Sequence, residues 1–363
     1  MNQVNAAVAA NTWPVIQYLY SWGINSTGTL GLGNTTNYSS PKQVGSLATW
    51  SKIAGSGSST AIKTDGTLWV WGQNDYGQLG LGNVTVYSSP KQVGALTTWS
   101  KIASGGACTI AIKTDGTLWA WGLNSYGRLG LGNTTNYSSP KQVGALTTWS
   151  NISTISNFVI ATKTDGTLWS WGYNGSGQLG LGNTVDKSSP NQVGALTTWS
   201  KISGCSAHSV AIKTDGTLWV WGQNDYGQLG LGNTTYYSSP KQVGALTNWF
   251  NMTGGECTIA IKTDGTLWAW GRNTSGQLGL GSTVNKSSPN QVGALTTWAT
   301  VSSTNFTLAT KTDSTFWSWG TNTFGQLGLG NTTYYSSPKQ VGALTTWVVV
   351  VAGSSHAITI KTS

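Results

Sequence analysis

The chain has 363 residues, of which only 8% are Asp, Glu, Lys or Arg, while 49 are Gly and 21 are Trp. So many Trp residues exclude an intrinsically disordered chain, because the area they bury offsets the entropy lost on folding. The formal net charge of +9 favours an anionic partner or surface in general and no particular one.

Simple counts argue against three kinds of partner or site. Arg128 and Arg272 are the only arginines in the sequence, whereas a nucleic-acid surface usually clusters Arg. The three cysteines show no CxxC spacing, so neither a disulfide framework nor a zinc site is indicated. The amino terminus lacks the regions of a Sec signal peptide, and no apolar run is long enough to span a bilayer. We therefore expect no membrane insertion, no metal and no cofactor.

The chain is organised as seven repeats of 49 or 50 residues, each beginning at a Trp-Gly pair. The repeats start at Trp22, Trp71, Trp121, Trp171, Trp221, Trp270 and Trp319. A period near fifty without helical periodicity is typical of propeller blades. We predict an all-β fold, a seven-bladed β-propeller of four-stranded antiparallel blades that forms a single domain over residues 1–363.

The first expected strand covers residues 18–22, whose sequence Tyr-Leu-Tyr-Ser-Trp matches a TLWSW phase found in later repeats. The chain ends at AITIKTS, without the DGTLWSW that should follow. We therefore expect the amino-terminal strand to complete the carboxy-terminal blade and close the ring, which removes its exposed edges.

Within a repeat, the expected strands are KQVG after Pro90, Trp99 to Ala103, 109–113 and 117–121. The last two flank Asp115-Gly116, which is typical of a type I′ hairpin because both central residues need φ > 0. Asp313-Ser314 breaks this Asp-Gly rule and should make its hairpin looser. Both faces of the WxW strands are apolar, as expected for sheets packed between neighbours.

The block WGQNDYGQLGLGN, followed by Pro-x-x-Val, resembles the repeat of the regulator of chromosome condensation family. The resemblance extends over essentially the whole chain from Tyr18 and implies a seven-bladed propeller with a strand shared across the termini. Members of that family include a guanine-nucleotide exchange factor, a plant photoreceptor and secreted β-lactamase inhibitors. This chain has no insertion in any repeat, a single Glu, Glu256, and no Gly-Trp-Arg-His-Thr motif. The property that the resemblance implies for this chain is binding to a partner.

No residue pattern indicates catalysis, so we predict that the protein is not an enzyme. His208 and His356 fall at one repeat phase but three blades apart, and Cys108 and Cys257 share that phase, so all four are expected to be structural. The GQLGLG motif leads into a Ser-Ser-Pro loop and not into a helix, so it is no phosphate loop.

Variation between otherwise similar repeats is the better guide to an interaction site. It concentrates after Trp-Gly and before Ser-Ser-Pro, and these loop positions are rich in Tyr, which suits recognition surfaces, although drift on exposed loops explains the pattern equally well. The candidate interaction loops contain Tyr76, Tyr126, Tyr226, Phe324, Tyr236, Tyr237, Tyr334 and Tyr335. A candidate basic arc consists of Lys42, Lys91, Lys141, Lys241 and Lys339.

We therefore expect a non-enzymatic binding or display propeller, as a structural or host-interaction component of a phage virion or a cell surface. Low charge, richness in Gly, Ser, Thr and Asn, and near-identical blades motivate this interpretation. One alternative is a protein- or glycan-binding inhibitor or lectin that uses the paired tyrosines 236–237 and 334–335. Another is a guanine-nucleotide exchange factor.

Overall fold

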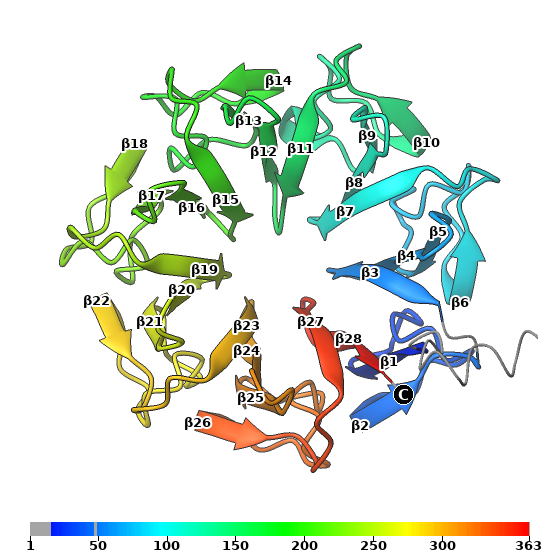
Figure 1. The fold of residues 1–363 in the computed structure, drawn as a ribbon. Coiled ribbons are helices and arrows are strands. Elements are labelled where there is room, and N and C mark those ends of the chain that lie inside the picture. The colour runs from blue at the N-terminus through cyan, green and yellow to red at the C-terminus, as the bar shows by residue number, and fades with distance from the viewer. Residues whose placement is uncertain (1–15, 47–48, 363) are drawn as a thin grey trace, which may run out of the picture.

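Seven four-stranded antiparallel sheets are arranged as blades around a central axis in the computed structural model, which describes residues 16–46 and 49–362 (Figure 1). The prediction of an all-β, seven-bladed propeller is confirmed. The three-residue η1 (Ser125–Gly127) is the one helix among the described residues, so no helix there could cross a membrane. The amino-terminal stretch inspected for a signal peptide lies largely outside the described residues.

The blades are numbered here in chain order. Blade 1 consists of β1 (Gln17–Gly23), β2 (Tyr38–Gln43), β27 (Trp347–Ala352) and β28 (His356–Thr362). Blade 2 consists of β3 (Trp50–Gly55), β4 (Ser58–Lys63), β5 (Leu68–Gly72) and β6 (Tyr87–Gln92). Blade 3 consists of β7 (Trp99–Gly105), β8 (Cys108–Lys113), β9 (Leu118–Gly122) and β10 (Tyr137–Gln142). Blade 4 consists of β11 (Trp149–Ser153), β12 (Phe158–Lys163), β13 (Leu168–Gly172) and β14 (Lys187–Gln192).

The remaining three blades repeat this order. Blade 5 consists of β15 (Trp199–Gly204), β16 (His208–Lys213), β17 (Leu218–Gly222) and β18 (Tyr237–Gln242). Blade 6 consists of β19 (Trp249–Gly254), β20 (Cys257–Lys262), β21 (Leu267–Gly271) and β22 (Lys286–Gln291). Blade 7 consists of β23 (Trp298–Ser303), β24 (Phe306–Lys311), β25 (Phe316–Gly320) and β26 (Tyr335–Gln340). In every blade, the strand that begins with Trp lies nearest the axis and the YSSP- or KSSP-type strand lies outermost (Figure 1).

Blade 1 closes the ring with strands from both ends of the chain. Its strand order is β2-β1-β28-β27, and β1 pairs with β28 over its whole length, with Leu19 opposite Ile360 and Ser21 opposite Ile358. The predicted closure by the amino-terminal strand is confirmed. The seam, where β1 pairs with β28, joins two strands from the amino-terminal end of the chain to two from the carboxy-terminal end, because β2 follows β1 into the same sheet.

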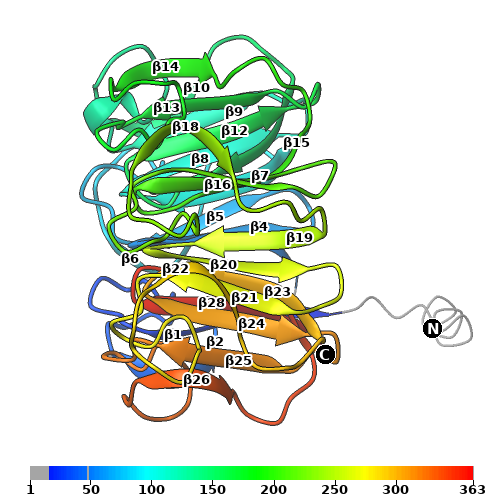
Figure 2. The ribbon, with the colours of Figure 1, turned by 90° about the vertical axis from the view of Figure 1, so that its left-hand side faces the viewer.

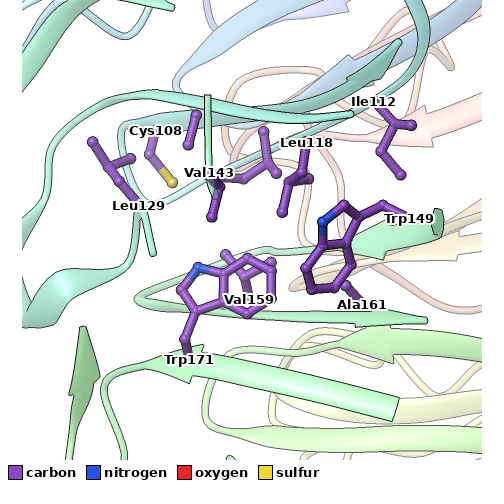
Figure 3. Packing of buried hydrophobic residues seen from close by; sticks show 11 residues of the cluster. Cys108, Ile112, Leu118, Leu129, Val143, Trp149, Val159, Ala161 and Trp171 are labelled. Carbon is purple, nitrogen blue, oxygen red and sulfur yellow. The ribbon is translucent and has the colours of Figure 1, made fainter. Parts of the chain in front are cut away.

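The apolar core lies between blades. Figure 3 shows the cluster between blades 3 and 4, where Leu118 and Val143 of blade 3 pack against Trp149 and Trp171 of blade 4. The two Trp rings meet edge to face with centroids 5.9 Å apart, a favoured aromatic geometry. Alternate residues of each WxW strand therefore contact two different neighbours, which explains why both strand faces are apolar.

The hairpins lie where expected, but the predicted type I′ turn is wrong. In blade 3, Gly116 has φ +77°, whereas Asp115 does not have a positive φ. The Gly116 amide donates to Lys113 O at 3.0 Å, and the Lys113 amide donates to Thr117 O at 3.1 Å. This is a three-residue loop with one left-handed residue, and the Asp115 carboxylate holds it by accepting bonds from the Thr117 amide and hydroxyl.

The outermost strands also differ from expectation. The predicted strand began after Pro90, but β6 starts at Tyr87 and contains this proline. A proline is tolerated there because the strand is at the sheet edge and its outer side needs no amide donor. A bulge between Val70 and Gly72 adjusts the register of β5 to β6.

Candidate functional site

A fourteen-residue loop joins the third and fourth strands of each blade, for example 73–86 in blade 2 and 223–236 in blade 5. These loops begin where the third strands end, opposite the β4–β5 type hairpins. They lie together on one side of the ring, opposite the side where β28 ends (Figure 2). We call this side the loop face.

A buried asparagine gives each loop its shape. In blade 5, Asn224 Oδ1 accepts from the Leu229 amide at 2.9 Å, and Asn224 Nδ2 donates to the carbonyls of Asn233 and Thr235. Asn224 is fully buried, as are its counterparts Asn25, Asn74, Asn124, Asn174, Asn273 and Asn322. The sequence interpretation did not single out this residue, although its invariable place two positions after Trp-Gly was a sufficient signal. A rigid base of this kind allows the loop tips to vary without loss of the fold.

Six of the eight candidate aromatic residues are exposed on this face. The exposed fractions are 42% for Tyr76, 46% for Tyr126, 37% for Tyr226, 36% for Phe324, 42% for Tyr236 and 47% for Tyr334. Tyr237 and Tyr335 differ, because they are the first, half-buried residues of the outermost strands β18 and β26. The paired tyrosines of the sequence therefore separate into one loop residue and one strand residue each.

Neighbouring loops of blades 3 to 6 contact each other through an aromatic ring in two places. Tyr126 lies 4.9 Å from the ring of Tyr173 in the next blade, and the Arg272 guanidinium lies 5.2 Å from the Tyr226 ring. Arg272 also pairs with Glu256 at 2.7 Å, the one ion pair among the described residues. Burial of the Tyr236 hydroxyl, and next its hydrogen bond to Asp225, raise the pKa of Tyr236. Tyr173, Arg272 and Glu256 were not predicted as site residues.

Arg128 gives the loop of blade 3 a conformation of its own. In five other repeats a Gln stands at this position, and its Oε1 accepts from the amide two residues earlier, as Gln228 does from Tyr226 at 2.9 Å. Arg128 has no acceptor atom, and its Nε donates to Ser125 O at 3.0 Å. The peptide between Ser125 and Tyr126 is therefore turned the opposite way from its counterparts in those repeats, and Tyr126 adopts φ +63° within η1.

The Arg128 guanidinium is buried, with 2% of the residue exposed, and its Nη1 donates to Gly106 O at 2.6 Å. No carboxylate pairs with it among the described residues. Burial lowers the pKa of Arg128, and a guanidinium stays charged even so. The loop face of blade 3 therefore contains a cation without a partner anion beside two tyrosines, Tyr126 and Tyr173.

The candidate basic arc lies elsewhere, on the outermost strands around the circumference. Each of its five lysines is exposed and lies over the tyrosine four residues earlier, as Lys91 does over Tyr87 at 5.5 Å. Blades 4 and 6 carry Lys at the tyrosine position and Asn at the lysine position, as in Lys187 and Asn191. The blades that lack the tyrosine therefore also lack the lysine, and a tyrosine ring attracts an ammonium group beside it. Lysines of blades 7, 1, 2 and 3 form a continuous arc, and Lys241 lies apart in blade 5.

The histidines and cysteines are buried between blades. His208 Nε2 lies 2.9 Å from Thr258 Oγ1, and His356 Nε2 lies 3.1 Å from Ser59 Oγ. Burial lowers the pKa of His208 to about 3 and that of His356 to about 4, so both imidazoles are neutral at neutral pH. Burial raises the pKa of Cys108 and of Cys257 to about 11. Among residues 16–46 and 49–362, no three His, Cys, Asp or Glu residues gather to form a metal site.

Comparison with protein families identifies seven copies of one repeat. The regulator of chromosome condensation (RCC1) repeat matches residues 18–62, 65–112, 115–161, 165–212, 215–257, 264–308 and 313–360. A second model of the same repeat matches residues 99–128 and 199–228. The search of curated proteins returned no match.

Solved structures share the fold at low sequence identity. Prp20 from Saccharomyces cerevisiae superposes with a TM-score of 0.86 at 19% identity, over 96% of this chain and 92% of that one. Human WBSCR16 superposes with a TM-score of 0.85 at 20% identity, over 96% of this chain and 99% of that one. The structure of Kap60 bound to yeast RCC1 (Prp20) gives a TM-score of 0.85 at 18% identity, over 96% and 90%. Because the family model matches nearly the whole chain, this protein belongs to the family of the regulator of chromosome condensation (RCC1) repeat.

Proposed function

We propose that this protein is a non-catalytic propeller that binds a partner protein through the loop face of blades 3 to 6. The observation that carries the proposal is the clustering of exposed aromatic side chains, and of both arginines of the sequence, on loops that differ between otherwise similar repeats. Tyr and Arg are the residues most often enriched in the energetically important parts of interfaces, and Tyr loses little entropy when it is fixed.

The electrostatics of the loops favour an acidic contact on that partner. Arg128 has no carboxylate partner, whereas Arg272 is satisfied by Glu256. The Arg128 guanidinium is buried 5.9 Å from the Tyr126 ring, so its uncompensated positive charge would attract a partner carboxylate over this loop without direct contact. A charge inside the protein is screened less than a charge in water, so it acts over the few ångströms to the loop surface.

A comparison of matched variants tests the proposal. The loop variant carries Tyr126→Ser, Tyr173→Ser and Tyr226→Ser. The control variant carries Phe250→Ser, Leu344→Ser and Val348→Ser, which remove comparably exposed apolar groups outside the fourteen-residue loops. Proteins captured from the source cells are quantified by mass spectrometry for the wild type and both variants. We expect the specific partner to be lost with the loop variant alone. Equal capture by the wild type and the loop variant would contradict the proposal.

Defined proteins provide the second arm. Prp20 binds Gsp1p and histones, and these serve as purified probes for this chain by surface plasmon resonance. A nucleotide-release assay with Gsp1p tests the exchange-factor alternative. We expect no acceleration of release, because the seven loops that join the third and fourth strands all have fourteen residues, so none of them carries an inserted wedge.

Display on a virion or cell surface is the finer form of the proposal, and the composition favours it. The sequence is rich in Ser, Thr, Asn and Gly and only 8% of its residues are charged, which suits a scaffold outside the cell. Surface biotinylation of source cells, or proteomics of purified particles, would detect the chain there. A glycan array with the same loop variant distinguishes a lectin from a protein binder. If the wild type binds a glycan and the loop variant does not, the ligand of the loop face is a glycan and not a protein.

A further inference from the structure

A groove lies between neighbouring blades, and none of the exposed aromatic residues of the loop face lines it. Five such grooves, from blades 2 and 3 to blades 6 and 7, have volumes of about 400 to 490 Å³. The groove between blades 5 and 6, of about 450 Å³, is lined by Leu231, Val243, Leu246, Trp249, Trp268 and Pro289. Leu246 is 48% exposed, and its five counterparts in other repeats are equally exposed. Each groove thus presents a mainly apolar wall to the outside.

A buried ammonium also lines this groove. Only 8% of Lys262 is exposed, and its Nζ lies 3.8 Å from the Trp268 ring centroid and 5.0 Å from that of Trp249. No carboxylate of the described residues pairs with it. The nearby Asp264 carboxylate instead accepts bonds from the Thr266 amide and hydroxyl.

The same contacts between a lysine and two tryptophans recur around the ring, and Lys113 lines the groove between blades 2 and 3 as Lys262 lines that between blades 5 and 6. Lys63, Lys113, Lys163, Lys213, Lys262 and Lys311 each lie 3.5–3.9 Å from one Trp ring and 5.0–5.2 Å from another. Burying a charge without a partner anion is costly, and aromatic faces compensate for only part of that cost. An external carboxylate beside the apolar wall would supply the missing counter-charge.

We propose that these grooves bind an extended segment of a partner protein in which apolar side chains alternate with carboxylates. The apolar side chain would lie against Leu246, Val243 and Trp268, and the carboxylate would reach Lys262. A protein segment is favoured over a small acid because equivalent grooves recur around one ring. A chain that occupies neighbouring grooves gains avidity that no single groove provides. The groove shares Leu231 with the blade 5 loop but contains none of the exposed aromatic residues of the loop face, so the inference does not depend on the proposed function.

The test uses protein labelled with ¹⁵N at the Trp indoles and a soluble peptide of alternating Leu and Glu. We expect saturable shifts of the groove indoles, including those of Trp249 and Trp268, while the buried indole of Trp22, between blades 7 and 1, stays unchanged. The same peptide with Gln in place of Glu should shift them at least ten times less at equal concentration. Equal shifts with both peptides, or no shift at millimolar peptide, would overturn the proposal.

Single-groove variants localise the effect. Lys262→Gln should abolish the shifts of Trp249 and Trp268 and leave the other grooves responsive, so that the other grooves report on folding. Leu246→Ser, at a half-exposed position, should weaken the same shifts without removing a buried charge. Shifts at Trp249 and Trp268 that persist in both variants would overturn the assignment. Saturation by octanoate without any response to the peptide would overturn the choice of a protein segment.

Discussion

Arg128 stands where five other repeats have Gln, and the exchange replaces an acceptor by a donor. The loop of blade 3 responds by turning a carbonyl towards the side chain, which forces Tyr126 to φ +63°. A non-glycine residue in this region costs about 1 kcal/mol or more. One residue thus accounts for the single helix among the described residues and for the different orientation of a candidate binding residue.

The variant Arg128→Gln should restore the loop conformation of the other blades. We expect a gain of about 1 kcal/mol in the free energy of unfolding, because relief of the strain outweighs loss of the bond to Gly106. Urea unfolding measures the gain, and a crystal structure should place Tyr126 at negative φ. A less stable variant that retains η1 would contradict this explanation.

The buried histidines predict a specific dependence of stability on pH. Their folded pKa values, about 3 and about 4, lie below the ordinary value of 6.5, so the folded state favours neutral imidazole. Their contribution is therefore complete above pH 6.5 and is lost as the pH falls towards about 4. Thermal unfolding across this range should show a falling midpoint.

The paired substitution His208→Ser and His356→Ser introduces the residue that blade 2 has at this phase, Ser58. We expect the midpoint of this variant to depend less on pH between 6.5 and about 4 than that of the wild type. The hairpin aspartates also lose protein-stabilising charge in acid, but only near or below their ordinary pKa of 3.8. An unchanged slope in the variant would assign the effect to other groups.

At the scale of the element, six hairpins test the sequence rule for turns. Five carry Gly at the left-handed position, and the Gly carbonyl accepts from the first Trp of the next blade at 3.1–3.2 Å. Ser314 adopts the same conformation, with φ +61°, and keeps the bonds within the turn. No corresponding bond joins it to Trp347, so the expected looseness lies in the contact between blades and not in the hairpin itself.

Ser314→Gly should therefore stabilise the protein by about 1 kcal/mol, since a left-handed residue with a Cβ is strained. The reverse change, Gly116→Ser, should destabilise it by about 1–2 kcal/mol or more, because an added Cβ would lie 2.1 Å from Thr147 O. Chemical denaturation of the two variants checks both signs. Effects in the same direction would refute the assignment of strain to Ser314.

At the scale of the whole molecule, the seam in blade 1 holds the ring closed. A disulfide from Tyr18→Cys and Lys361→Cys would link opposite residues of β1 and β28. It would constrain nearly the entire chain, with a chain-entropy gain on the order of 5 kcal/mol. The control pair Lys213→Cys and Thr217→Cys spans one hairpin, for which the same estimate is about 2 kcal/mol. Thermal unfolding under oxidising conditions measures the stabilisation by each disulfide. A smaller stabilisation by the seam disulfide than by the hairpin disulfide would contradict the role of the seam in holding the ring closed.

The sequence predicted the ring because period, strand pattern and the mismatched chain ends all pointed to one closed architecture. Turn type was mispredicted, since Asp-Gly suits two hairpin geometries and the Asp115 bonds to Thr117 select between them. Candidate loop residues were recognised from variation between repeats. Their partners Tyr173 and Arg272 were missed, because contacts between neighbouring loops depend on how blades pack, which one repeat does not encode. Arg128 was visible as a departure from Gln, but its consequence required the hydrogen-bond geometry.

The two-plus-two composition of blade 1 also has a consequence for assembly. The β1–β2 half of this sheet binds the β27–β28 half within the same chain. The effective concentration of one half near the other depends on how the other six blades place the two ends of the chain. Another copy of the chain has an identical β27–β28 half. Refolding at high protein concentration therefore favours exchange of half-sheets between molecules, and refolding at low concentration favours closed monomers. The concentration at which the protein folds should therefore change the ratio of closed monomers to exchanged oligomers.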